Sequence, residues 1–269
     1  MAFQNPHPVL YDDSMQRNVV DTTEPDIAEY SRNENVYFAF IDVLGFKQTF
    51  DENRENPGQE FAEKYAKTFQ YYSHLINLII NKSTFMESEK PVTYGAGQTS
   101  DSLYFYTTRL DYLVNFIHLY SHFSLYAMSE GVFFRGGIAK GSLFVNQPYQ
   151  FYGDSVIKAY LLESSIAKYP RLALDQITYE DLQNTKASMN THSKNGRCYI
   201  CPFAKMNFSE FLKTVGLEES EVRQIDKKTW EKIGEEIKKN KARFEFDEHN
   251  FQKYNYLLEE FESTGFPYE

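Results

Sequence analysis

The sequence predicts an α+β fold in which helices pack on a mainly antiparallel sheet. Short apolar runs typical of strands alternate with long amphipathic segments typical of helices, in the order strand, helix, hairpin, helix, strand, helix, strand. The chain has 269 residues, of which 17% are aromatic, and this is enough to bury a sizeable core. No internal repeat interrupts the order.

The first half of the sheet is predicted from three segments. A continuous apolar run at residues 36–42 predicts a buried strand, which ends in Asp42 and is followed by a turn containing Gly45. Residues 59–81 carry apolar side chains at steps of three and four, which indicates one apolar face of a helix. Two short strands are expected next, at 92–97 and 103–107, joined by a turn that holds Asp101.

The second half of the core is predicted in the same way. A helix is expected over 111–130, with Gly131 directly after it as a stop signal. Residues 132–145 favour a strand and hairpin that carry the sequence Arg-Gly-Gly-Ile at 135–138. A third helix at 155–168 and a short strand at 171–174 complete the pattern.

The chain divides into three predicted parts. Residues 1–34 are polar and broken by prolines, which indicates a loose arm. Residues 35–175 form the expected central α+β domain, and 176–269 form a mostly helical extension packed on it. Within this extension, 218–244 alternates charges of both signs on a helical pattern; we interpret it as a solvated face, with partner binding as the alternative.

The charge balance narrows the functional classes. Twenty-eight Lys and Arg stand against 38 Asp and Glu, a net charge of -10, which argues against a protein that wraps a nucleic-acid backbone. No apolar run reaches the roughly 20 residues that a membrane span needs, and the first residues lack the pattern of a secretory signal. We therefore expect a cytoplasmic protein that binds neither nucleic acid nor membrane.

Asp42 and Asp101 are the candidate metal ligands. In an antiparallel sheet with the expected order, both carboxylates meet at the same end of neighbouring strands. Paired carboxylates with a nearby backbone carbonyl suit Mg²⁺ or Mn²⁺, and two such ions serve phosphoryl transfer. The turn through Gly45 could supply N–H groups to phosphate oxygens. The alternative is that Asp42 is a turn former at a strand end.

Three other motifs have simpler interpretations. Cys198 and Cys201 are spaced as half a zinc site, but the chain has no second cysteine pair, so two ordinary thiols are expected. His118 and His122 lie four residues apart on a packing helix, which favours buried or interfacial histidines over metal ligands. The glycines at 136–137 lack nucleotide-loop spacing and indicate a bulge or a close strand approach.

The combination of blocks resembles the class III nucleotidyl cyclases. Phe-Ile-Asp-Val-Leu-Gly-Phe at 40–46 is similar to their first metal motif, and Ser-Asp-Ser-Leu-Tyr-Phe at 100–105 to their second. The Arg-Gly-Gly-Ile strand and the helix containing Ala-Tyr-Leu-Leu-Glu at 159–163 resemble more specifically the bacterial pyrimidine cyclases of Pycsar antiphage systems. The resemblance covers about 36–175, with a weaker likeness at 253–257.

The resemblance implies a ferredoxin-like class III cyclase domain and a definite activity. It implies conversion of UTP, or alternatively CTP, to the 3′,5′-cyclic nucleotide and pyrophosphate, as a second messenger in antiphage defence. Asp42 and Asp101 would bind two Mn²⁺ or Mg²⁺ ions with the carbonyl of Val43, and Gly45 and Phe46 would contact the substrate. Family members are head-to-tail homodimers with active sites at the subunit boundary.

One departure from the family opens an alternative. Ile157 and Leu161 stand where adenylyl and guanylyl cyclases carry the Asn and Arg that stabilise the transition state. Arg135 is then a candidate catalytic cation and Lys140 a candidate substrate-binding one, although Arg135 could equally pair with a carboxylate. The alternatives are a catalytically degenerate nucleotide-sensing or protein-interaction module, or another palm-like enzyme such as a cyclic-dinucleotide synthase. The absence of a Gly-Gly-Asp-Glu-Phe-like hairpin argues against the synthase.

Overall fold

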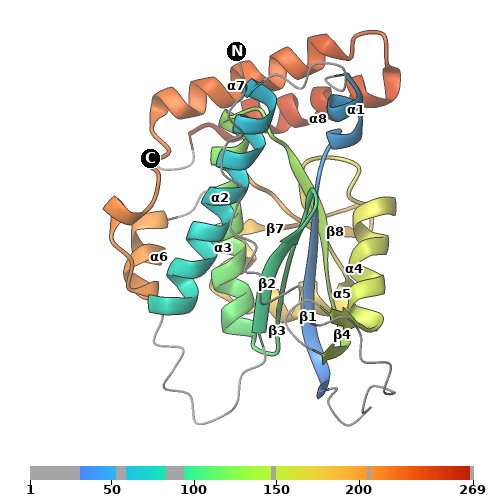
Figure 1. Ribbon diagram of the computed structural model, residues 1–269, viewed down its shortest axis with the longest axis vertical. Coiled ribbons are helices and arrows are strands. Elements are labelled where there is room, and N and C mark those ends of the chain that lie inside the picture. Colours follow the sequence, from blue (N-terminus) through green and yellow to red (C-terminus); the bar gives the residue numbers. More distant parts are fainter. Residues whose placement is uncertain (1–30, 53–58, 83–93, 147–149, 205–206, 267–269) are drawn as a thin grey trace, which may run out of the picture.

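The computed structural model describes residues 31–52, 59–82, 94–146, 150–204 and 207–266. These ranges contain one sheet, with helices on both of its faces (Figure 1). The strands are β1 (Ser31–Val43), β2 (Tyr94–Thr99), β3 (Ser102–Thr107), β4 (Phe134–Asn146), β5 (Gln150–Tyr152), β6 (Leu172–Leu174), β7 (Thr191–Lys194) and β8 (Arg197–Ile200). The α-helices are α1 (Phe46–Glu52), α2 (Gln59–Lys82), α3 (Leu110–Ser129), α4 (Asp154–Ser165), α5 (Gln176–Gln183), α6 (Phe208–Val215), α7 (Lys227–Arg243) and α8 (Glu248–Thr264). The described ranges also hold two short 3₁₀ helices, η4 (Lys186–Asn190) and η5 (Glu219–Glu221).

The strand order confirms the predicted α+β class. The strands lie in the order β2-β3-β1-β4-β6-β8-β7, with β5 paired to β4 outside this path. Within the described sheet every pairing is antiparallel except β4 with β6. The unit from β1 to β4 connects its strands through α2 and α3, and its order β2-β3-β1-β4 is that of a ferredoxin-like split βαβ fold.

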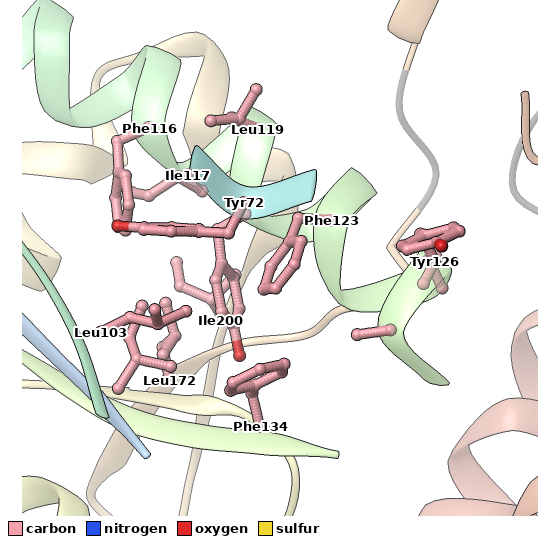
Figure 2. Packing of buried hydrophobic residues seen from close by; sticks show 14 of the residues in the cluster. Tyr72, Leu103, Phe116, Ile117, Leu119, Phe123, Tyr126, Phe134, Leu172 and Ile200 are labelled. Atoms are coloured by element: carbon pink, nitrogen blue, oxygen red, sulfur yellow. The ribbon is translucent and has the colours of Figure 1, made fainter. Parts of the chain in front are cut away.

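The larger core lies between the sheet and the helices α2 and α3. Figure 2 shows it at close range, with Tyr72 of α2 and Phe123 of α3 facing Leu103, Phe134 and Leu172 of the strands. These side chains are buried, and aromatic pairs such as Tyr72 with Phe123, with ring centroids 5.4 Å apart, fill the layer. Burial of this apolar area is the main force that holds the helices on the sheet.

On the opposite face of the sheet, α4 packs against β1 and β4. A smaller cluster forms there from Phe38 of β1, Ala139 of β4 and Ala159 of α4. Alternation along β1 places Phe38, Phe40 and Asp42 on this face, because successive side chains point to opposite sides of a strand. The side chain of Asp42 therefore lies on the α4 face, at the end of its strand.

The predicted helical extension is present and packs on the sheet end. Figure 1 shows α7 and α8 lying across the end at which β1 leads into α1. Trp230 of α7 stacks on Phe261 of α8, with ring centroids 4.3 Å apart, and Tyr254 of α8 contacts Phe133 at 5.2 Å. The side of α7 that carries Trp230, Ile233 and Ile237 is thus buried against the rest of the protein, while its charged side faces solvent.

Several boundaries differ from those expected. The strand β1 begins at Ser31 rather than 36, and the rest of the predicted arm, like residues 92–93, lies outside the described residues. The turn after Gly45 continues into a short helix, α1, that was not predicted. Strands β7 and β8 form a hairpin in a segment expected to be partly helical, and they extend the same sheet past residue 175.

Candidate active site

The sheet brings Asp42 and Asp101 to one end of neighbouring strands. Asp42 lies opposite Ser102 in the register of β1 and β3, and Asp101 is the adjacent residue in the two-residue turn between β2 and β3. That turn is tight because Ser100 adopts a positive φ of 56°. The Ser102 hydroxyl donates to Asp42 Oδ1 at 3.1 Å, which fixes the orientation of this carboxylate.

The electrostatics of Asp42 are unfavourable for an isolated anion. Burial raises its pKa above the usual value of an aspartate, and the negative charge of Asp101 raises it further. Hydrogen bonding from Ser102 and the positive charge of Arg135 act in the opposite direction without cancelling the increase. The fold thus holds two carboxylates near each other, and a bound cation would relieve the electrostatic repulsion between them.

Arg135 lies beside Asp42 on the neighbouring strand β4. The two residues are opposite each other in the β1–β4 register. The guanidinium pairs with Glu163 of α4, with Nη2 to Oε1 at 2.7 Å, and the side chains are 23% and 4% exposed. Burial raises the pKa of Glu163, and the Asp42 charge adds to the increase while Arg135 opposes it. Arg135 is therefore paired with one deeply buried carboxylate, and its positive charge also acts on the neighbouring Asp42.

The paired glycines of β4 explain how Glu163 reaches Arg135. A Cβ on Gly137 would lie 2.3 Å from the Ala159 carbonyl oxygen and 2.6 Å from Leu162 Cβ, so α4 sits directly against the strand. A Cβ on Gly136 would lie 2.4 Å from the Phe40 carbonyl oxygen. The predicted close approach of a neighbouring strand is confirmed at Gly136, whereas the neighbour at Gly137 is a helix rather than a strand.

The turn after β1 positions the other predicted substrate residues. Val43 is buried at the end of β1, so its backbone carbonyl is the group that it could offer to a ligand. Gly45 has a φ of 74°, and its carbonyl accepts from Thr49 N at 3.0 Å, which begins α1. Phe46 is half-buried and meets the Tyr65 ring edge-on, with centroids 5.1 Å apart. Phe46 thus packs on α2 from the rim of the site, and its contact with substrate stays a prediction.

Lys140 does not join these residues within one chain. It pairs with β1 at Tyr37, five positions along the strands from the Asp42–Arg135 pair, and it points to the opposite face of β4 from Arg135. Its ammonium contacts Asp181 Oδ2 at 2.8 Å and lies over the Tyr37 ring. The structure therefore places Lys140 in a separate ion pair, and a role in substrate binding is not supported by its position in the protomer.

Two residues near the site were not predicted. Glu163 is the one charged residue on the buried side of α4 in the described chain, and an acidic side chain facing a Gly-Gly strand is a signal that could have identified it. Lys253 of α8 lies near enough to Arg135 for the two charges to affect each other. The weaker family likeness at 253–257 includes this residue, but its proximity to Arg135 depends on how α8 docks, which no local pattern indicates.

The remaining motifs have structural roles. His122 is buried, its Nε2 is 3.1 Å from the Tyr71 hydroxyl, and its ring stacks on Phe208 at 3.9 Å. Burial lowers the pKa of His122 to about 3 and that of His118 to about 4, so both are packing histidines, as expected. Cys198 and Cys201 are buried free thiols.

The donor set fits a divalent cation that is completed by a ligand. Among the described residues no group of three or more His, Cys, Asp and Glu side chains gathers around one point. Asp42 and Asp101 provide two carboxylates, and the Val43 carbonyl follows Asp42 directly in the chain. Mg²⁺ is commonly held by one or two carboxylates together with substrate phosphates, so these residues fit that mode.

None of the described helices combines the length and the apolar composition that a membrane span requires.

Comparison with known proteins shows only distant structural similarity. No protein-family profile and no curated protein matches the chain. A mutant of the guanylyl cyclase domain of the RhoGC fusion protein from the aquatic fungus Blastocladiella emersonii is 14% identical, with a TM-score of 0.46, over 66% of this chain and 99% of that one. A bacterial light-regulated adenylyl cyclase is 13% identical, with a TM-score of 0.39, over 71% and 59%. A class III adenylyl cyclase-like ATP-binding protein from Pseudomonas aeruginosa is 13% identical, with a TM-score of 0.39, over 78% and 45%. Similarity at this level does not establish a shared activity.

Proposed function

We propose that the chain is a metal-dependent pyrimidine nucleotide cyclase, which converts UTP to 3′,5′-cyclic UMP and pyrophosphate. The observation that carries the proposal is the convergence of Asp42 and Asp101 at one end of the sheet, next to Arg135. These are the residues of the two metal motifs and the Arg-Gly-Gly-Ile strand of the sequence resemblance. The preference for UTP over CTP, and a role in antiphage defence, rest on that resemblance alone.

The residues of the chain have distinct tasks in this proposal. Asp42 and Asp101 hold Mn²⁺ or Mg²⁺, and Ser102 keeps the Asp42 carboxylate in one orientation. When bound, the ions supply positive charge that neutralises the triphosphate and makes the 3′-hydroxyl more acidic. Arg135, oriented by Glu163, is the chain's cation for charge that develops on the α-phosphate.

The site is proposed to be completed by a second copy of the chain. On α4 the side chains of Ile157, Tyr160 and Leu161 are 61%, 54% and 52% exposed. This helix covers the face of the sheet on which Asp42 lies, and Tyr160 meets the ring of Phe40, two residues before Asp42, edge-on. A homodimer that covers this α4 surface would remove these exposed side chains from water.

A catalytically inactive nucleotide-binding module is the alternative function. It is favoured by one observation, that Ile157 and Leu161 place two apolar side chains on α4 where a cyclase of the adenylyl or guanylyl type presents Asn and Arg. Such a module would keep the carboxylates and bind a triphosphate with metal, but it would release no pyrophosphate.

Product identification separates the two functions. The purified protein is incubated with each of the four ribonucleoside triphosphates and Mn²⁺, and products are identified by mass spectrometry. The proposal expects a cyclic pyrimidine nucleotide, abolished in Asp42→Asn and Asp101→Asn and retained in Glu235→Gln, an exposed carboxylate on α7. Metal-dependent triphosphate binding without any cyclic product, with phage lysate added as a possible activator, would favour the inactive module.

A further inference from the structure

A groove with a volume of about 390 Å³ lies between α2 and the segment that contains η5. Lys67, Tyr71 and His74 line it from α2, and residues 220–223 line it from the other side. Because α2 and α4 pack on opposite faces of the sheet (Figure 1), the groove is on the other side of the sheet from the Asp42 side chain. Its volume is within the range of small-molecule pockets, roughly 300–1,000 Å³.

The Arg223 guanidinium is held at this groove by aromatic rings. It lies over the rings of Tyr71 and Tyr126, at 5.4 and 4.8 Å from their centroids, and the backbone N–H of Arg223 donates to the Tyr71 hydroxyl at 2.9 Å. Within the described ranges no acidic side chain forms an ion pair with it. Contacts with aromatic faces position a guanidinium without neutralising its charge, so its donors stay available to an anion.

Two further basic side chains line the groove from α2. His74 Nε2 lies 2.9 Å from the Glu221 carbonyl oxygen, which fixes the position of the imidazole. Lys67 pairs with Glu63 at 3.5 Å, but both side chains are exposed, so this pair is weak and the ammonium can turn to another anion. Of the described residues that line the groove, Glu221 alone is acidic, and its Oε2 accepts from Glu218 N at 3.0 Å. Positive charge thus exceeds negative charge along the groove, in a chain whose net charge is -10.

We propose that this groove binds a small phosphate-bearing ligand, with Arg223 and Lys67 as its phosphate contacts. A guanidinium can donate two parallel hydrogen bonds to phosphate oxygens, and an ammonium on the opposite wall can reach a third oxygen. His74 adds a donor when its ring is protonated. A phosphate monoester carries roughly 1.5–2 negative charges at neutral pH, which suits cations on two walls better than a single carboxylate does.

Such a ligand would connect α2 to the segment that precedes α7. Tyr71 and Val222 line the groove beside the basic groups, so an organic part of the ligand has room next to its phosphate. A ligand that binds only when α2 and this segment are docked stabilises the folded state. We therefore expect the temperature of unfolding to rise with the concentration of the ligand.

Calorimetric titration of the full chain tests the proposal. The probes are ribose 5-phosphate, inorganic phosphate and, as the uncharged control, ribose; the buffer contains a chelator, so that no metal recruits phosphate elsewhere. We expect saturable binding of ribose 5-phosphate and none of ribose. Arg223→Gln and Lys67→Gln should each weaken this binding at least about tenfold, the effect of one lost charge-assisted hydrogen bond. Arg197→Gln, which removes an exposed guanidinium from β8, should leave it unchanged.

Lys67→Gln keeps the test decisive if Arg223→Gln does not fold, because it changes an exposed side chain. Thermal unfolding checks each variant, and ribose 5-phosphate should raise the Tm of Arg197→Gln more than that of Lys67→Gln. Equal affinity for inorganic phosphate would support the site and show that the phosphate alone supplies the affinity, whereas tighter binding of the ester would support an organic ligand.

Two results would overturn the proposal. The first is the absence of saturable binding of both phosphates, or binding that is undiminished in the folded groove variants. The second is binding of an acidic peptide such as hexaglutamate without binding of ribose 5-phosphate, which would assign the groove to a protein partner.

Discussion

Asp42→Asn should change the stability of the protein in opposite ways with and without metal. Burial and the nearby Asp101 raise the pKa of Asp42, so the folded state disfavours its ionised form. Ionisation of Asp42 therefore lowers the free energy of unfolding. This loss is absent below the ordinary pKa of an aspartate, and it is complete once the pH exceeds the raised pKa of Asp42 in the folded state. Asparagine removes the charge and keeps the oxygen that accepts from Ser102 at 3.1 Å. In metal-free buffer at neutral pH the variant should therefore unfold at the same or a higher temperature than the wild type.

Metal should reverse this ranking. A ligand that binds only the folded state at a hundred times its Kd stabilises by about 2.7 kcal/mol. For a chain of this size that corresponds to an increase in Tm of roughly 5–10 °C. The wild type should show this increase with Mn²⁺ because its carboxylates are available, and the increase should become larger as the pH rises and Asp42 ionises. Asp42→Asn should gain little.

Scanning calorimetry at several Mn²⁺ concentrations measures both effects. Glu235→Gln on α7 is the matched control, because it removes one exposed negative charge away from the site and should follow the wild type. A lower Tm of Asp42→Asn in metal-free buffer would show that the carboxylate is stabilising there, contrary to the sign argued above. An undiminished Mn²⁺ response in the variant would show that Asp42 is not a ligand.

Three further substitutions test the packing around the site. Glu163→Gln should lower the free energy of unfolding by about 2–3 kcal/mol, measured in urea, because it leaves a mostly buried guanidinium without its carboxylate; a loss below 0.5 kcal/mol would contradict this. Gly137→Ala should cost about 3 kcal/mol, since its Cβ would meet the backbone of α4 at 2.3 Å. Gly196→Ala, where φ is 69° and the space is open, should cost only about 1–2 kcal/mol, and an equal loss would contradict the steric argument. Leu161→Glu should convert the proposed dimer to a monomer, measured by light scattering, whereas Ile177→Glu, at an equally exposed position on α5, should not. A dimer that persists in Leu161→Glu would place the interface elsewhere.

The fold and the carboxylate pair were predictable because their signals are local. The apolar run that ends in Asp42 marks a buried strand, and the polar residues around Asp101 mark a turn between two strands. Given antiparallel pairing, these two facts alone bring the carboxylates together. The hairpin of β7 and β8 was not predicted, although the sequence carries a local signal for it: Asn195 and Gly196 are a typical type I′ turn pair, and both adopt positive φ.

The cations of the site were less predictable because their positions depend on long-range packing. Arg135 was a candidate from its motif, but its pairing with Glu163 depends on α4 reaching the strand at Gly137. Lys140 belongs to the same motif, yet strand alternation sends it to the other face, where it meets Asp181. A sequence motif therefore identifies residues that share a strand without showing which of them share a site.

The docking of α8 connects the stability of the C-terminal helices to the chemistry of the sheet end. Arg171 precedes β6, next to the start of β4, and its guanidinium lies over the rings of Tyr199 and Tyr256 at 4.3 and 5.3 Å. Tyr256 and Tyr254 thus hold α8 at two points along one sheet edge. Phe133, the partner of Tyr254, directly precedes the strand that carries Arg135, so the docking of α8 is coupled to the position of that strand. A ligand bound at this end of the sheet would then stabilise α8 against local detachment, because binding to the docked state alone shifts the equilibrium toward it.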